Sequence, residues 1–372
     1  MICMKRKLIA LAVVGAFVAP AAMADTANVN VYGAVNMAFA ATNSGTSAAG
    51  VAGTSTTQVS SQTSKLGFKG SEDLGGGTSA IWQLESGITP DTTGGVTASG
   101  RNSFVGLSGE SWGAVLLGQN DSPYKSSTRG MDLFGDDIAD NRALMGAGVI
   151  AFDNRNANVV QYNSPNLSGF KASAQYAAGA ETATASGQSK GDLWSLAATY
   201  ADGPMNFAAA YEAHNFGTAG TGTLGATGIA AKDKKETAYK VAGGYKMDAG
   251  AVNLIYEKTN DDFGAGGVAA NDHRAWYLAG KFNVSASDAV KLAYTNRGNI
   301  GSAANTGARQ ISVGYDHGMS KRTTVYALYT KLNNDSAAAN KISTAGSTAG
   351  GFALPGAGAS PSVWALGMKH IF

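Results

Sequence analysis

The sequence predicts an all-β protein, a transmembrane antiparallel β-barrel of about 16 strands. Segments of about ten residues alternate apolar and polar side chains. In 206–212, for example, Phe207, Ala209 and Tyr211 share one strand face, while Ala208, Ala210 and Glu212 share the other. Short turns and long polar loops alternate along the chain, and no apolar stretch beyond the first residues is long enough for a membrane-spanning helix. One strand face with bulky apolar side chains and one with small or charged side chains are typical of a wall between lipid and a hydrated lumen.

The N-terminus predicts a signal peptide over residues 1–24. Lys5, Arg6 and Lys7 form its charged region, residues 8–18 form a short apolar region, and Ala22-Met23-Ala24 forms a cleavage site. Composition is uniform afterwards, so we expect residues 25–372 to form a single barrel domain.

Charge and cysteine content exclude two classes of function. Without the signal peptide, the chain has 25 basic and 26 acidic side chains. It therefore lacks the excess of positive charge that a nucleic-acid partner would require. The single cysteine, Cys3, lies in the signal peptide, so disulfides and cysteine-ligated metals are excluded from the exported chain.

About sixteen segments are strand candidates, although 101–107, 114–118, 156–162 and 323–330 alternate poorly. We expect strands at 28–39, 64–69, 80–85, 101–107, 114–118, 156–162, 170–176, 193–200, 206–212, 239–246, 251–258, 276–282, 290–297, 310–315, 323–330 and 362–372. A ten-residue strand rises about 33 Å and, tilted by about 45°, covers about 23 Å of the apolar band of an outer membrane, which is about 25 Å. A strand of about ten residues is therefore long enough to cross once.

The connections indicate the orientation of the barrel. Short turns such as 72–77 and 201–204 are rich in Gly, Asp and Pro, whereas 41–56, 119–154, 214–235 and 332–360 are long. Outer-membrane barrels have short periplasmic turns and long extracellular loops. We therefore expect the outer membrane of a Gram-negative bacterium as the location, with both termini on the turn side.

Four segments resemble one known family. The final strand, 362–372, ends in Gly-Met-Lys-His-Ile-Phe, and the segments 64–77, 101–107 and 117–124 accompany it. They resemble the general diffusion porins of beta-proteobacteria. The resemblance implies a homotrimer in outer-membrane lipid and lipopolysaccharide. Each barrel would be a water-filled pore for ions and small solutes, narrowed by its third long loop, about 119–154.

The resemblance and the strand parity together select candidate site residues. The family's basic cluster at the pore constriction matches Lys65, Arg101 and Arg155. The third loop carries the acidic set Asp121, Asp132, Asp136, Asp137 and Asp140, together with Lys125, Arg129 and Arg142. Parity predicts further charges facing the lumen at Lys69, Lys171, Lys240, Lys246, Lys281, Lys291 and Arg297. A basic wall facing an acidic loop would create a transverse field. A wall rich in Lys and Arg favours anions, whereas five aspartates in one loop favour cations or near neutrality. We expect a weak anion preference, because charges on the sheet are held more rigidly than charges on a loop.

Two other functions fit the sequence less well. An outer-membrane enzyme would need a nucleophile, a base and an orienting group at one place, but the four histidines are scattered and no catalytic motif is present. A substrate-selective channel would need an aromatic slide, for which Tyr124 and Phe134 are too few. We expect no cofactor, with loop-bound calcium at Asp136-Asp137 or Asp261-Asp262 as an alternative.

Overall fold

The computed structural model describes residues 28–92, 95–179, 191–218, 233–263, 271–342 and 356–372. The expected signal peptide, residues 1–24, lies outside the described residues. The chain forms β-strands at β1 (Asn28–Asn43), β2 (Ser55–Ser61), β3 (Lys65–Gly75), β4 (Thr78–Thr89), β5 (Gly95–Gly100), β6 (Ser103–Gly109), β7 (Gly113–Asp121), β8 (Arg155–Asn163), β9 (Phe170–Ala178), β10 (Asp192–Asp202), β11 (Met205–Asn215), β12 (Lys235–Met247), β13 (Gly250–Asp261), β14 (Arg274–Asn283), β15 (Asp288–Arg297), β16 (Ala308–Gly318), β17 (Thr323–Asn334) and β18 (Ser362–Ile371).

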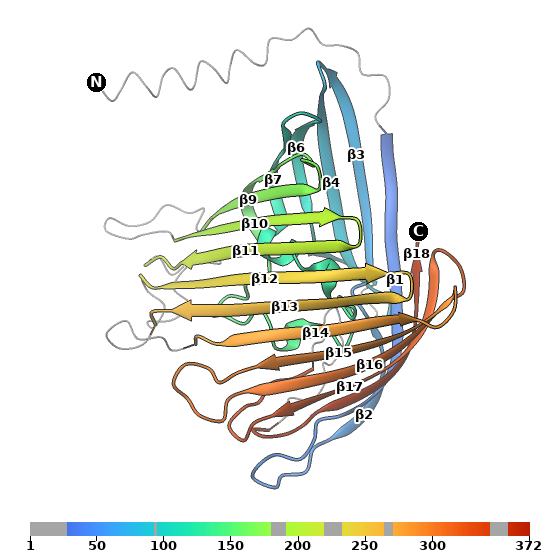
Figure 1. The fold of residues 1–372 in the computed structure, drawn as a ribbon, viewed down its shortest axis with the longest axis vertical. Coiled ribbons are helices and arrows are strands. Elements are labelled where there is room, and N and C mark those ends of the chain that lie inside the picture. Colours follow the sequence, from blue (N-terminus) through green and yellow to red (C-terminus); the bar gives the residue numbers. More distant parts are fainter. Residues whose placement is uncertain (1–27, 93–94, 180–190, 219–232, 264–270, 343–355) are drawn as a thin grey trace.

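These 18 segments form the 16 strands of a closed antiparallel barrel (Figure 1). β2 and β3 pair with successive parts of β1, and β5 and β6 pair with successive parts of β4. Each couple is therefore one strand with a short break, at 62–64 and at 101–102. β18 pairs with β1 from Ala34↔Ile371 to Asn43↔Ser362, and this seam closes the cylinder and removes unpaired edges. The predicted fold class and strand number are confirmed.

The outer surface of the wall is apolar. Phe39 and Leu292 are each 54% exposed, and Trp364 is 66% exposed. Aromatic pairs mark the end of the barrel that carries the long loops: Tyr176 and Trp194 flank the loop between β9 and β10, with ring centroids 4.8 Å apart, and Tyr329 and Trp364 lie 4.4 Å apart. Such rings prefer the membrane interface, so these pairs mark its outer boundary.

Adjacent residues of β15 provide a test of which face meets lipid. Leu292 is outward, whereas Lys291 is directed inward and pairs with Asp316 at 2.9 Å. We expect Leu292→Arg to lower the stability of the barrel by about 2–4 kcal/mol, because it places a cation at mid-membrane depth. Lys291→Arg, which keeps the inward charge, should leave stability nearly unchanged. Denaturant unfolding in lipid vesicles measures both, and equal stability of the two variants would contradict the assignment of the faces.

The third long loop, 122–154, folds into the barrel (Figure 1). It contains α2 (Pro123–Ser126) and the 3₁₀ turns η1 (Arg129–Met131) and η2 (Asn141–Ala143). Ser122 begins α2 as its N-cap, because its hydroxyl accepts from the Lys125 amide and Pro123 supplies a suitable first position. Among the described residues, no helix has the length and apolar character needed to span a bilayer.

Contacts from β13, β14 and β16 hold the first half of this loop. Tyr277 of β14 donates its hydroxyl to Asp132 at 2.9 Å, and Asn253 of β13 donates to the Met131 carbonyl at 2.9 Å. The ring of Phe134 lies on β16 at Gly314, where an added Cβ would come within 2.8 Å of it. These contacts place the first half of the loop against the β13–β16 side of the barrel.

Candidate functional site

The two strand breaks position the first basic residues of the site. Thr63 lies in the first break with a φ of 53°, a conformation that is strained for a β-branched residue, and β3 begins two residues later at Lys65. Arg101 lies in the second break. Between them, on β4, Glu85 pairs with Arg101 Nε at 2.5 Å and with Lys65 Nζ at 3.8 Å, and it accepts from the Tyr32 hydroxyl at 3.0 Å. Glu85 thus orients both cations.

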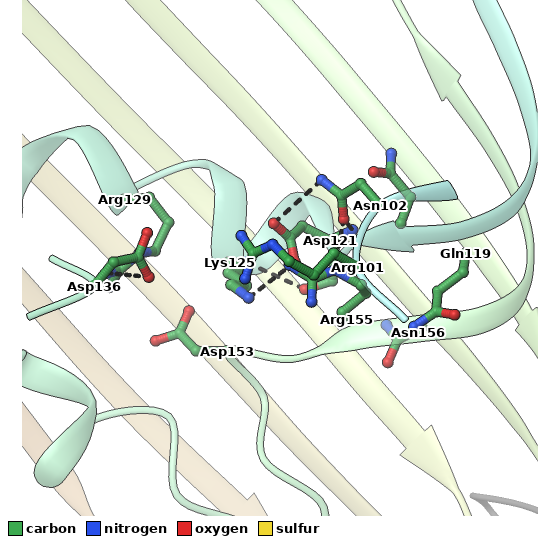
Figure 2. A network of polar contacts seen from close by, with 12 residues as sticks. Arg101, Asn102, Gln119, Asp121, Lys125, Arg129, Asp136, Asp153, Arg155 and Asn156 are labelled. Atoms are coloured by element: carbon green, nitrogen blue, oxygen red, sulfur yellow. Dashed lines mark hydrogen bonds and ion pairs between the residues drawn. The ribbon is translucent and has the colours of Figure 1, made fainter. Parts of the chain in front are cut away.

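Arg155 joins this cluster from the first position of β8. It lies opposite Asp121, the last residue of β7, and the two side chains pair at 3.0 Å. Asn102 accepts from Arg155 Nε at 2.6 Å and from the Asp121 amide at 3.0 Å, while Lys125 pairs with Asp121 at 2.8 Å. Figure 2 shows these side chains gathered in one network. The three residues predicted as a basic cluster therefore lie together, each with an ion-pair partner.

A second ionic cluster lies within the loop itself. The carboxylate of Asp140, whose side chain is fully buried, pairs with Arg129 at 2.8 Å and Arg142 at 2.6 Å. Asp136 pairs with Arg142 at 2.9 Å. Burial alone would raise the pKa of Asp140, but the two guanidinium groups outweigh burial and hold its pKa below the usual range. This cluster ties the two ends of the 129–142 segment together.

Both clusters face one polar cavity of about 560 Å³. Its charged lining consists of Lys65, Arg101, Lys125, Arg129, Arg142 and Arg155 on the basic side and Glu85, Asp121, Asp136 and Asp153 on the acidic side. The expected geometry, in which a basic wall faces an acidic loop, differs from this one. The loop places three cations, Lys125, Arg129 and Arg142, in the cavity beside Asp136 and Asp153, while Asp132 and Asp140 are buried and Asp137 does not line it. Arg129 pairs with Asp132 at 3.6 Å and with Asp140 at 2.8 Å, so these two carboxylates face the loop's own arginine.

The further charges predicted by parity divide into two groups. Lys240 and Arg297 lie on the inner face but are 2% and 5% exposed, and they hold loops rather than line open water. Lys240 pairs with Asp153 of the third loop at 2.7 Å, and Arg297 donates to Asn340 at 2.6 Å. The others have outward-facing apolar or aromatic neighbours and lie outside the cavity described above: Lys69, Lys171, Lys246, Lys281 and Lys291.

Sequence reasoning missed three residues of the site. Glu85 follows the outward Leu84, which is 59% exposed, so parity alone could have identified it as a lumen carboxylate. Asn102 and Asp153 carry no comparable signal, because their roles depend on partners far away in sequence.

The structure gives little that could hold a metal ion. Within the described part of the chain, no group of three His, Asp or Glu side chains is arranged so that it could hold a metal ion. Of the two acidic pairs named for calcium, Asp136 faces Arg129 and Arg142, and Asp262 accepts from the Lys235 amide at 2.8 Å.

A closed barrel with an apolar exterior, a loop folded inside and a charged cavity of about 560 Å³ defines an outer-membrane channel protein. A family model described as Gram-negative porin matches residues 10–337, and the chain belongs to this family. It is 31% identical to outer membrane porin protein 32 of Delftia acidovorans, over 99% of this chain and 100% of the relative. It is 28% identical to the major outer membrane protein P.IB of Neisseria lactamica, over 76% of this chain and 80% of the relative.

Solved structures agree with the family. An anion-selective porin from Comamonas acidovorans superposes with a TM-score of 0.75 at 25% identity, covering 93% of this chain and 100% of that one. The outer membrane protein OmpT of Vibrio cholerae, at 16% identity and a TM-score of 0.64, shares the fold. The protein is thus an outer-membrane porin that forms a water-filled channel for passive diffusion of ions and small hydrophilic solutes.

Proposed function

We propose that this channel prefers small anions and that Lys65, Arg101 and Arg155 set the preference at its constriction. The observation that carries the proposal is the lining of the cavity, where six basic side chains outnumber four acidic ones. Two unit charges about 10 Å apart at an effective dielectric of about 20 interact by about 1.7 kcal/mol, which biases ion partition without tight binding. The similar Comamonas structure, an anion-selective porin, supports the same sign.

Reversal potentials across planar bilayers in a salt gradient test the proposal. We expect Arg101→Ala to lower the anion-to-cation permeability ratio by about threefold at low salt, less at high salt because of screening. The change removes a cation and also leaves Glu85 with only Lys65 as a cationic partner. Lys246→Ala, a lumen lysine outside the cavity, is the matched control. A ratio that stays the same in both variants would remove Arg101 from the constriction.

We also propose that the protein is a homotrimer in lipopolysaccharide-containing outer membrane and works without a cofactor or catalysis. Exposed apolar side chains such as Phe39, Leu292 and Trp364 would give such an assembly its lipid and subunit contacts. Native mass spectrometry in detergent tests the trimer. Current that rises linearly with solute concentration would support a general pore, whereas saturable block by one solute would favour a substrate-selective channel.

A further inference from the structure

His214 lies in an unusual setting on the inner face of β11. Its side chain is fully buried, Nδ1 lies 2.7 Å from Glu236 Oε1, and Nε2 lies 3.0 Å from Glu212 Oε1. Ionised carboxylates only accept hydrogen bonds, and an imidazole ring donates from both nitrogens only when it is protonated. The geometry therefore fits an imidazolium held between two carboxylates. The sequence assigns this histidine no role, because it places residue 214 at the start of the long loop 214–235, whereas the structure places it in β11.

The same carboxylate holds the final part of the third loop. Glu236 of β12 accepts from the amide of Val149 at 2.8 Å and from the amide of Ile150 at 3.1 Å. The ring of Phe152 stacks on the His214 ring, with centroids 4.5 Å apart and planes at 17°. Three positions of residues 146–154, which we call the second arm, thus depend on the His214–Glu236 pair.

Charged and titratable side chains from three strands and the second arm surround the His214–Glu236 pair. β11 contributes Glu212, and the second arm contributes Asp153, which pairs with Lys240 of β12 at 2.7 Å. From β13, Glu257 lies 3.8 Å from Lys240 and 3.8 Å from His273. On the other side, β10 places Leu193 beside His214 in register. His214 is therefore the cation that directly faces both Glu212 and Glu236.

We propose that His214 is a positioning residue: its protonated ring fixes Glu236, and Glu236 and the ring together fix the second arm at the edge of the channel. Asp153 and Asn154 at the end of this arm line the cavity, so the position of the arm sets part of the channel outline. The first arm, 129–142, has its own anchors in the Asp140 cluster and Tyr277. The two arms therefore respond to different residues.

The proposal fixes the direction of the pH dependence. When His214 loses its proton at alkaline pH, one ring lone pair faces a carboxylate oxygen in a dry site, and the two side chains separate. Glu236 then no longer holds the amides of Val149 and Ile150. The second arm should therefore be more rigid near neutral pH than in alkali, while the first arm should not follow the alkaline change.

Amide hydrogen exchange on the whole protein in lipid nanodiscs tests this. In His214→Gln at about pH 7, we expect peptides covering 146–152 to exchange about tenfold faster than wild type, and peptides covering 132–142 to stay unchanged. His317→Gln is the matched control, because His317 pairs with Asp288 at the turn end and does not contact the loop. Open-channel current noise should rise in His214→Gln only.

Wild-type protein provides an independent test if the variant does not fold. The ratio of exchange rates in 146–152 and 132–142, corrected for intrinsic chemistry, should be constant near neutrality and increase toward about pH 10. A ratio that stays flat over the whole range would overturn the proposal. So would a His214→Gln protein with wild-type protection of the second arm, or one in which both arms loosen equally.

Discussion

Asp140→Asn is expected to lower the free energy of unfolding by about 3 kcal/mol and to loosen the first arm of the loop, because it leaves the partly buried Arg129 and Arg142 without their main counter-charge. The fully buried carboxylate pairs with Arg129 and Arg142 and also accepts from the Asp136 and Arg142 amides. An amide group would turn one N–H toward a guanidinium. The partly exposed Asp136 remains as a weaker partner of Arg142. The expected loss of unfolding free energy is therefore at the lower end of the range for a broken buried ion pair.

Guanidinium unfolding in detergent and single-channel conductance measure this effect. Asp137→Asn is the control, since Asp137 accepts from the Ile138 amide and lies outside the Arg129–Arg142 cluster. Because the pKa of Asp140 is lowered in the folded state, its stabilisation is complete above the ordinary carboxyl pKa of about 3.9 and is lost only as the pH falls below it. Equal stability and conductance of the two variants at neutral pH would exclude Asp140 as the anchor of the first arm.

The barrel could be predicted from the sequence because its determinants are local. Alternation of side chains along each segment places Lys65 and Lys171 on the inner face without knowledge of any partner strand. Turn chemistry and loop length give the orientation in the same way. The strand breaks were not visible, because they depend on how β1 and β4 shift their pairing from one segment to the next. Arg101 was accordingly placed within a strand, whereas it lies in a break.

The interior of the site could not be predicted to the same depth. Whether a loop aspartate faces water or an arginine depends on which groups meet when the loop enters the barrel, and those partners are far apart in sequence. Glu257 illustrates this, since it bonds to residues 133 and 111 positions away. Lys240 shows the related limit of parity: its inward direction was predicted, but its burial by Asp153 depends on the loop.

Glu257→Ala is expected to release two points of the third loop at once. The buried carboxylate accepts from the Tyr124 hydroxyl at 2.8 Å and from the Gly146 amide at 2.7 Å, so one side chain of β13 joins both ends of the loop to the wall. Removing it leaves two buried donors unpaired, at about 1–3 kcal/mol each. The substitution also removes one of the two carboxylates near Lys240, whose ion pair with Asp153 remains.

A graded series separates this anchoring from a general loss of packing. Glu257→Gln keeps one acceptor oxygen and should cost about half as much as Glu257→Ala, while Asn253→Ala, which removes a single bond to the Met131 carbonyl, should cost about 1 kcal/mol. Unfolding free energies and channel conductance should follow the same order, because a less firmly held loop narrows the channel less consistently. If Glu257→Ala left both quantities at the level of Asn253→Ala, the loop would be held mainly by the Asp140 and Tyr277 contacts, and Glu257 would be only one of several equivalent wall contacts.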